Sequence, residues 1–412
     1  MNVHVEQSRN FDTSEVPFRF EELFYSRTDG RGVIVAGNSV FQRVSGFEWD
    51  KLLGAPHKVL RHPDMPRSMF RVMWDAIGKG YPMGVYVKNR SADGRWYWVY
   101  AVILPLGDGY ISVRMKPSSP VFDKIREVYA AILLKEEAPD FDLEEGAGML
   151  RQCASHWGFG SLTNMMAHAI GQELAARDQA MGRPQETRTK ILIGLNKMLE
   201  QAAVEQAGLL RSFEALQSIP NNMRLVASRL EPSGGPVSAI SENYKASSVG
   251  ISERLRSFVG GKGNLCERMS REVARALFLL GAARILDEMI ESFSLETPHS
   301  MQNWEDERCM LERLAKECAA NAREALDKGG EAAAALSRSS ADIRRQMLGL
   351  DTIRVLGRVE CGRMREQGGG LSAAIDQLDT FHADIKGRLE ALMGLSEAIT
   401  LGMAAYLREA TR

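Results

Sequence analysis

Apolar residues recur at alternating steps of three and four along two stretches in the second half of this chain. The first stretch comprises Leu192, Leu195, Leu199, Ala202, Gln206, Leu209, Phe213 and Leu216. The second comprises Leu371, Ile375, Leu378, His382, Ile385, Leu389, Leu392, Ser396, Ile399 and Met403. This spacing predicts coiled-coil-like helices that pack along a seam. The polar members Gln206, His382 and Ser396 favour a role in setting register over a catalytic role.

The same half contains an internal duplication. Residues 234–255 align without gaps to residues 368–389, and the segments before them, which begin at Arg224 and Arg354, also match. Each copy consists of a helix, a glycine-rich turn and a return helix. We therefore predict two helical hairpins, at about 190–258 and 330–405, within an all-α bundle spanning residues 150–412.

The first half differs in composition, because it is rich in aromatic and β-branched residues and in glycine turns. Strands are predicted at 23–26, 33–36, 85–90, 96–104 and 110–115. Helices are predicted at 38–44, 49–53 and 68–78, the first capped by Asn38 and stopped by Gly46. These elements predict an α+β domain over residues 20–117, with one antiparallel sheet. Short helices would cover one face of the sheet, and the space between could hold a ligand.

A proline-bounded corner, Arg61-His62-Pro63-Asp64-Met65-Pro66, precedes the longest of these helices. Proline fixes φ and disfavours helix in the residue before it, so the corner should be rigid. It is either a structural hydrogen-bond knot or the rim of a binding pocket. In the first case Asp64 would cap the following helix and His62 would bond a backbone group. A metal or haem site using His57 and His62 has little support, because no further ligand set accompanies them.

Composition narrows the functional classes. Lysine and arginine number 52 against 53 aspartates and glutamates, so no overall field attracts nucleic acid or an anionic membrane. The five cysteines are scattered without a Cys-x-x-Cys pair, which favours a reducing cytoplasm and argues against zinc or disulfides. No apolar run is long enough to span a membrane, and the first ten residues lack a secretory signal. No phosphate-binding loop, cyclase, kinase or nucleophile–base motif is present, so we expect a cytoplasmic protein that is not an enzyme.

Several segments of the first half resemble the PAS domain of bacterial aerotaxis receptors. They are Phe41-Gln42-Arg43-Val44-Ser45-Gly46-Phe47, residues 54–66, Met73-Trp74, Val87-Lys88-Asn89-Arg90 and Tyr97-Trp98-Val99. In that family the domain holds FAD noncovalently and reports oxygen or electron-transport status through the redox state of the flavin. The resemblance implies that Arg61, His62, Asp64, Trp74 and Asn89 bind the flavin, with Asn38 as a further candidate.

The implied contacts agree with the chemistry of a flavin. Trp74 could pack on the flat isoalloxazine, and the amide of Asn89 could read its polar edge with both a donor and an acceptor. Arg61 could meet a pyrophosphate in a forked geometry. The sequence departs from the family at Met83, which follows Tyr81-Pro82 where the family has tryptophan. The Met83 thioether could still pack against the ring.

The remaining segments complete the predicted organisation. Residues 1–19 are expected to form an N-terminal cap or flexible segment, and residues 118–149 an exit helix followed by an acidic linker. Residues 222–239 faintly resemble the hairpin tip of chemoreceptor signalling domains, without the residues that contact the kinase.

The resulting hypothesis is a dimeric redox sensor that signals to a downstream protein, with the chemotaxis machinery as one candidate. The alternative is a cofactor-free PAS interaction module on a helical scaffold.

Overall fold

A computed structural model describes residues 14–184, 187–228, 235–258, 263–293, 303–363 and 369–410. The chain divides into two compact units. The first contains the residues up to Trp157 together with Ser161–Ile193 and Ala274–Glu324. The second contains Gly158–Gly160, Gly194–Val273 and Ala325–Arg412. The first unit therefore contains helical residues from beyond residue 150 as well as the α+β domain.

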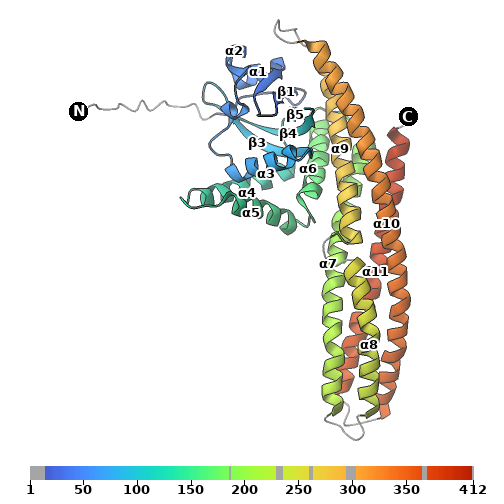
Figure 1. Ribbon diagram of the computed structural model, residues 1–412. Coiled ribbons are helices and arrows are strands. Elements are labelled where there is room, and N and C mark those ends of the chain that lie inside the picture. Colours follow the sequence, from blue (N-terminus) through green and yellow to red (C-terminus); the bar gives the residue numbers. More distant parts are fainter. Residues whose placement is uncertain are drawn as a thin grey trace, which may run out of the picture. The chain divides into compact units, whose positions relative to one another are not determined.

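The first unit is built on a five-stranded antiparallel sheet with the strand order β2-β1-β5-β4-β3 (Figure 1). The strands are β1 (Phe24–Asp29), β2 (Ile34–Gly37), β3 (Met83–Arg90), β4 (Trp96–Leu106) and β5 (Gly109–Met115). All five lie within a few residues of their predicted positions. The α+β fold with one antiparallel sheet is therefore confirmed.

Short helices cover one face of this sheet. They are α1 (Ser39–Ser45), α2 (Trp49–Leu52), the 3-10 helix η1 (His57–Leu60) and α3 (Arg67–Gly78). Asn38 caps α1 as predicted, since its Oδ1 accepts from the backbone N–H of Phe41 at 3.1 Å. Gly46 ends the helix at a φ of 69°, a left-handed conformation that glycine adopts without a side-chain clash.

The N-terminal segment is partly ordered against the sheet. The backbone N–H of Val16 donates to the carbonyl of Trp96 at 2.8 Å, and the buried Phe18 ring meets Phe24 edge-on at 5.0 Å. Residues 14–19 are therefore a packed part of the domain. The remainder of the predicted flexible segment, residues 1–13, lies outside the described residues.

The predicted acidic linker is in part a helix. Helix α4 (Pro120–Glu136) is followed after six residues by α5 (Leu143–His156). The side chain of Asp142 accepts from the backbone N–H of Glu144, and Glu144 and Glu145 occupy the first turn. Acidic residues stabilise the positive end of a helix, so this cluster starts a helix.

The predicted all-α region from residue 150 begins with two separate helices, because α5 ends before α6 (Leu162–Ala180) begins. Gly158 between them has a φ of 84°, and the side chain of Ser161 caps α6 by accepting from the backbone N–H of Asn164. A left-handed glycine followed by a side-chain cap is a helix stop and a new start.

Helices from distant parts of the sequence cover the opposite face of the sheet. Beside α6, this layer contains the second part of α9 (Leu265–Phe293) and the first turns of α10 (Trp304–Arg363) (Figure 1). A Cβ on Gly84 of β3 would lie 2.9 Å from the ring of Phe278, so the strand and α9 approach closely. The Phe293 ring meets the Tyr25 ring of β1 edge-on at 5.2 Å.

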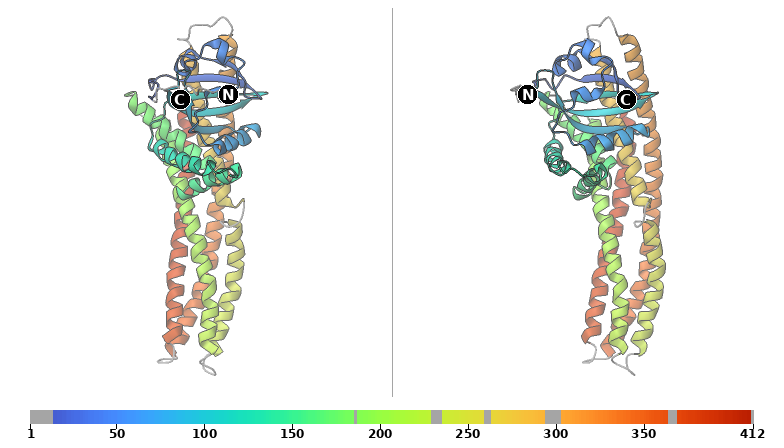
Figure 2. Two further views of the ribbon diagram at one scale, coloured as in Figure 1. Left: turned by 90° about the vertical axis from the view of Figure 1, so that its left-hand side faces the viewer. Right: turned by 60° about the vertical axis from the view of Figure 1, so that its left-hand side comes forward.

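The second unit is a helical bundle. Helices α7 (Thr187–Ser228), α8 (Gly235–Phe258), α10 and α11 (Gly369–Ala410) run side by side there (Figure 2). Their seam residues are buried, among them Leu209, Leu216, Ile385 and Leu392. The glycine turns of the two predicted hairpins fall largely at 229–234 and 364–368, outside the described residues.

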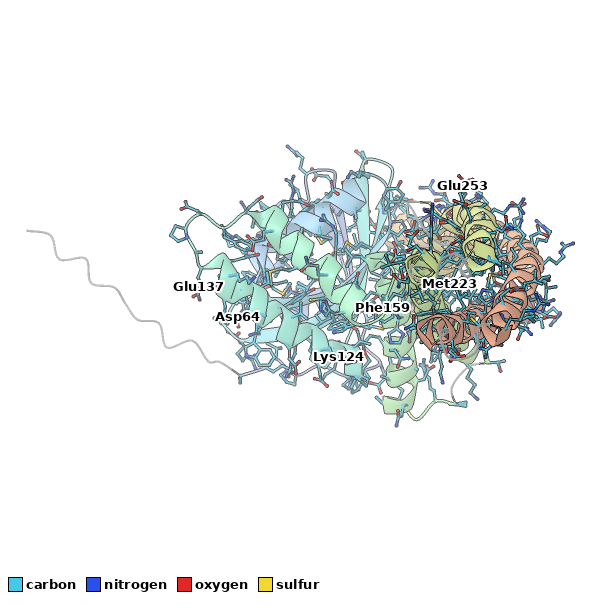
Figure 3. All side chains as sticks on the ribbon, turned by 90° about the horizontal axis from the view of Figure 1, so that it is seen from below. Asp64, Lys124, Glu137, Phe159, Met223 and Glu253 are labelled. Carbon is cyan, nitrogen blue, oxygen red and sulfur yellow. The ribbon has the colours of Figure 1, made fainter. Side chains whose placement is uncertain are left out.

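Polar seam residues of the bundle are hydrogen-bonded. His382 contacts Asp351 of α10 through Nδ1 at 2.6 Å and the Tyr244 hydroxyl of α8 through Nε2. Ser396 donates to the carbonyl of Leu392 within its own helix. Seen along the bundle, Glu253 lies on its outer surface, whereas Met223 is buried (Figure 3). The three-helix contact of His382 agrees with a role in fixing register.

Among the described residues, no helix has the length and apolar character needed to cross a membrane. Within the same residues, no group of three or more His, Cys, Asp or Glu side chains is arranged to hold a metal ion.

Candidate functional site

A cavity of about 300 Å³ lies between the sheet and the helices α3 and η1. The sheet supplies its polar wall, whose members are Ser26 and Thr28 of β1, Asn89 of β3, and Tyr110, Ser112 and Arg114 of β5. These residues share one face because side chains alternate along a strand, and Ser26 pairs directly with Ser112 across β1 and β5. The cavity is at the lower end of the size range of small-molecule sites.

The opposite wall is largely aromatic and apolar. Helix α3 contributes Phe70, Met73, Trp74 and Ile77. The Trp74 ring meets Tyr110 edge-on at 5.6 Å and is 37% exposed, so it stands at the mouth of the cavity. Gly32 makes this possible, because a Cβ there would lie 2.8 Å from the indole. A flat apolar wall facing a polar one suits a planar ligand with polar edges.

Arg114 is the most unusual group in the cavity. It is 5% exposed, and its Nη2 donates to Ser26 Oγ at 2.8 Å and to His57 Nε2 at 2.7 Å. Its Nη1 is buried without a hydrogen-bond partner. Burial lowers the pKa of Arg114 to about 10, which still leaves the guanidinium protonated at neutral pH.

His57 is held neutral beside that cation. Burial, followed by the nearby charge of Arg114, lowers the pKa of His57 to about 3. Its Nε2 accepts from Arg114 and therefore carries no proton of its own. The pair carries a single positive charge, and among the described residues no aspartate or glutamate lines the cavity.

Two further donors are left unsatisfied. Arg61 Nε and Ser112 Oγ are buried and have no hydrogen-bond partner among the described residues. The Arg61 guanidinium lies 3.6 Å from the centre of the Phe70 ring, a cation–π contact that fixes its position over the cavity wall. An unpaired buried polar group costs about 1–3 kcal/mol, so a ligand that accepted hydrogen bonds from these three groups would remove that cost.

The proline-bounded corner has two roles in the structure. Arg61 faces the cavity, whereas the next residues tie the corner to β3. The backbone N–H of His62 donates to the Lys88 carbonyl at 3.4 Å, and the Lys88 ammonium pairs with Asp64 at 2.5 Å. His62 Nδ1 accepts from the backbone N–H of Asp64, which is the backbone bond foreseen for a structural histidine.

Asp64 does not cap α3, contrary to one sequence-based alternative. Glu136 at the end of α4 takes that role, since its carboxylate accepts from the backbone N–H groups of Arg67 and Ser68, both at 2.8 Å. Lys88 supplies a nearer partner for Asp64, and the helix-start residue Pro66 makes no side-chain cap.

Of the seven candidate site residues named from the sequence, the cavity brings together three: Arg61, Trp74 and Asn89. His62 and Asp64 support the corner from outside the lining. Asn38 is buried elsewhere, where it accepts from the backbone N–H of Tyr25 at 2.9 Å and donates to the Leu23 carbonyl. Met83 lies at the start of β3 and lines a separate apolar space with residues of α3, α5 and α6, including Met69, Leu150 and Met166.

The sequence did not lead us to expect Ser112 and Arg114 in the site, and it suggested His57 only as a weak candidate for a metal or haem ligand. A usable signal was present in β5, where Ser112 and Arg114 alternate with Ile111, Val113 and Met115. Both faces of that strand are buried. Polar residues at every second position of a fully buried strand indicate a polar cavity on that side.

Comparison with known proteins agrees with this architecture. Residues 34–111 match a family model described as the PAS fold. This part of the chain is a PAS domain. The aerotaxis receptor of Escherichia coli strain K12 is 35% identical over 121 residues, which are 28% of this chain and 24% of that receptor. The resemblance drawn from the sequence is thereby confirmed over the PAS region.

A second relative is the bacterioopsin transcriptional activator of Halobacterium salinarum, 28% identical over 81 residues, or 20% of this chain and 12% of the activator. The chain spans a quarter or less of the length of both relatives. Their names describe a receptor and an activator, not enzymes.

Solved structures similar to the PAS domain include the light state of the blue-light photoreceptor Aureochrome1 LOV. It is 25% identical with a TM-score of 0.22, and the alignment covers 27% of this chain and 89% of that one. A light-oxygen-voltage domain studied with a flavin analogue is 22% identical with a TM-score of 0.23, covering 28% and 87%.

Proposed function

We propose that the PAS domain binds a flavin, FAD by its resemblance to aerotaxis receptors, and that the protein is a redox or oxygen sensor. The observation that carries this proposal is the cavity itself. It combines an aromatic wall, an amide at Asn89 and three buried donors without partners, and no carboxylate lines it in the part of the chain that the structure describes. A cationic cavity of this kind favours a planar ligand that accepts hydrogen bonds and carries negative charge.

The residues present fit that group. Trp74 and Phe70 would cover the isoalloxazine, and Asn89 would address its polar edge. Arg114, Arg61 and Ser112 would donate hydrogen bonds to its acceptor atoms or phosphates. A bound flavin supplies reversible electron transfer coupled to a change in charge and protonation. His62 and Asp64 would act on the ligand indirectly, by holding Arg61 in place through β3.

A cavity cation next to such a ligand makes the domain sensitive to the ligand's charge. The Coulomb interaction with Arg114 is stronger inside a dry cavity than in water, so each redox state would favour a different arrangement of the sheet. The helical region would carry that difference to a downstream signalling protein, and we include the chemotaxis machinery and a homodimeric state in this proposal.

The test is the absorption spectrum of the purified protein. Flavin gives bands near about 370 and 450 nm, and denaturation followed by chromatography distinguishes FAD from FMN. Asn89→Ala should lower the flavin content, whereas Arg90→Ala should retain it, because Arg90 is the exposed neighbour on the same strand. A colourless protein that takes up neither flavin from solution would refute the proposal and favour a cofactor-free interaction module.

A further inference from the structure

Strand β1 lines one side of the cavity and is also contacted on the opposite face of the sheet. On β1, Ser26 and Thr28 face the cavity, whereas Tyr25 and Arg27 project from the opposite face of the sheet. Arg114 reaches β1 directly, since its Nη2 donates to Ser26 Oγ at 2.8 Å. Any displacement of Arg114 by a ligand therefore acts on the strand that carries Tyr25 and Arg27.

Glu307 in the first turn of α10 contacts both Tyr25 and Arg27. Its carboxylate accepts from the Tyr25 hydroxyl and forms a two-pronged ion pair with Arg27, with Nε at 2.9 Å and Nη2 at 2.6 Å. Glu307 is 4% exposed, so the contact is buried. A buried, forked ion pair is sensitive to geometry, because small shifts separate charges that water does not reach.

Aromatic packing joins the same helices to β1. Phe293 at the end of α9 meets Tyr25 edge-on at 5.2 Å, and Trp304 at the start of α10 lies 5.3 Å from Phe293. Trp304 Nε1 is buried without a hydrogen-bond partner. The beginning of α10 is thus assembled around a strand that lies 280 residues earlier in the chain.

The exit helix offers a less direct route. Helix α4 follows the sheet in sequence, and Tyr129 donates to the Tyr86 carbonyl at 3.2 Å, but α4 is interrupted after Glu136. By contrast, α10 is one uninterrupted helix of 60 residues, and it supplies residues to both compact units. A rigid helix transmits a displacement at its first turn better than a chain broken by turns.

We propose that Glu307 is the output contact of the PAS domain, coupling the state of the cavity to α10 through Arg114, Ser26 and β1. The inference rests on the proposed flavin site. A change in ligand charge would displace Arg114, and the hydrogen bond to Ser26 would pass that displacement to β1. The contacts of Glu307 with Arg27 and Tyr25 would then change. In this proposal these contacts have two arrangements, and the cavity and α10 each influence which one is populated.

Hydrogen–deuterium exchange of the full chain tests the coupling. Exchange in peptides covering residues 303–312 should differ by about 3-fold or more between the flavin-oxidised and dithionite-reduced protein. Glu307→Gln should abolish that difference while the flavin spectrum stays unchanged. Glu305→Gln is the matched control, since Glu305 lies two residues away and its side chain is 67% exposed.

Three outcomes separate this inference from the flavin proposal. A yellow protein whose exchange at 303–312 ignores reduction would overturn the coupling and leave the flavin site intact. A colourless protein would overturn both. If Glu307→Gln fails to fold, Tyr25→Phe removes only the hydroxyl contact, and an undiminished redox-dependent difference in that variant would also count against the output contact.

Discussion

The first unit contains two deeply buried arginines with opposite surroundings. Arg177 of α6 is 2% exposed, pairs with Glu288 of α9 and donates through Nε to the Phe20 carbonyl at 2.8 Å. Arg114 is 5% exposed, has only neutral partners and leaves Nη1 unpaired. Arg177, which joins helices, has a carboxylate partner and a backbone acceptor, whereas Arg114, which faces the cavity, lacks a carboxylate partner among the described residues. Burial alone therefore does not identify a ligand-binding arginine. The absence of a carboxylate partner is the feature that does.

The largest expected effect lies at Arg177. Arg177→Met should lower the free energy of unfolding by about 3 kcal/mol, because it leaves Glu288 and the Phe20 carbonyl short of a buried partner. Urea denaturation would measure the change. Arg183→Met is the control, since Arg183 is half exposed and contacts Glu288 only at 3.4 Å. Equal, small losses in both variants would remove the contrast between the two arginines.

The converse substitution tests Arg114. Arg114→Met should change the stability of the ligand-free protein by less than about 1 kcal/mol, because it removes a desolvated charge that has no carboxylate partner. Flavin affinity should fall by about 10- to 100-fold, since charged hydrogen bonds contribute about 1.5–3 kcal/mol. Flavin titration followed by fluorescence would measure this. A large loss of stability with unchanged affinity would make Arg114 a second structural arginine.

Measuring stability as a function of pH tests whether His57 is the neutral partner of Arg114. The folded pKa of about 3 is below the ordinary value of 6.5, so the unfolded chain binds more protons between these values. The contribution of His57 to the free energy of unfolding should be complete above pH 6.5 and should be lost as the pH falls toward 3. His57→Gln keeps an acceptor for Arg114 and should flatten this part of the profile of melting temperature against pH. His156→Gln, at an exposed position, is the control for the loss of a histidine side chain as such.

The smallest effect is expected at Ser112. Its hydroxyl has no hydrogen-bond partner in the described ranges, so Ser112→Ala should leave the free energy of unfolding unchanged or slightly raised. Flavin affinity should fall by about 2- to 10-fold, the range for one neutral hydrogen bond. Thermal denaturation and flavin titration measure the two quantities separately. Destabilisation by more than about 1 kcal/mol would show that Ser112 has a structural role.

Local patterns in the sequence were sufficient for most of the elements. Alternation and turn residues located all five strands, the Asn38 cap and the Gly46 stop located α1, and the three–four apolar spacing located the seams of α7 and α11. Each of these signals depends on neighbours within one or two turns of the chain. The acidic run at 142–145 was misread as a linker because a helix start and a solvated segment share that composition.

The candidate site was only partly accessible in the same way. Resemblance to aerotaxis receptors pointed to Arg61, Trp74 and Asn89, which line the cavity, but also to His62, Asp64 and Asn38, which do not. Whether a side chain faces the cavity depends on the strand register and on how the corner docks on β3. Those are tertiary facts, so sequence order alone could not separate the two groups.

The sequence by itself determined which segments form strands, helices and seams, because these follow from local backbone preferences and side-chain spacing. Only the tertiary structure showed that Arg114 has no carboxylate partner among the described residues. It also showed that Glu307 pairs with Arg27 of β1, which lies 280 residues earlier in the chain. Electrostatic pairing depends on distance in space and on the exclusion of water, and neither is written in the order of residues along the chain.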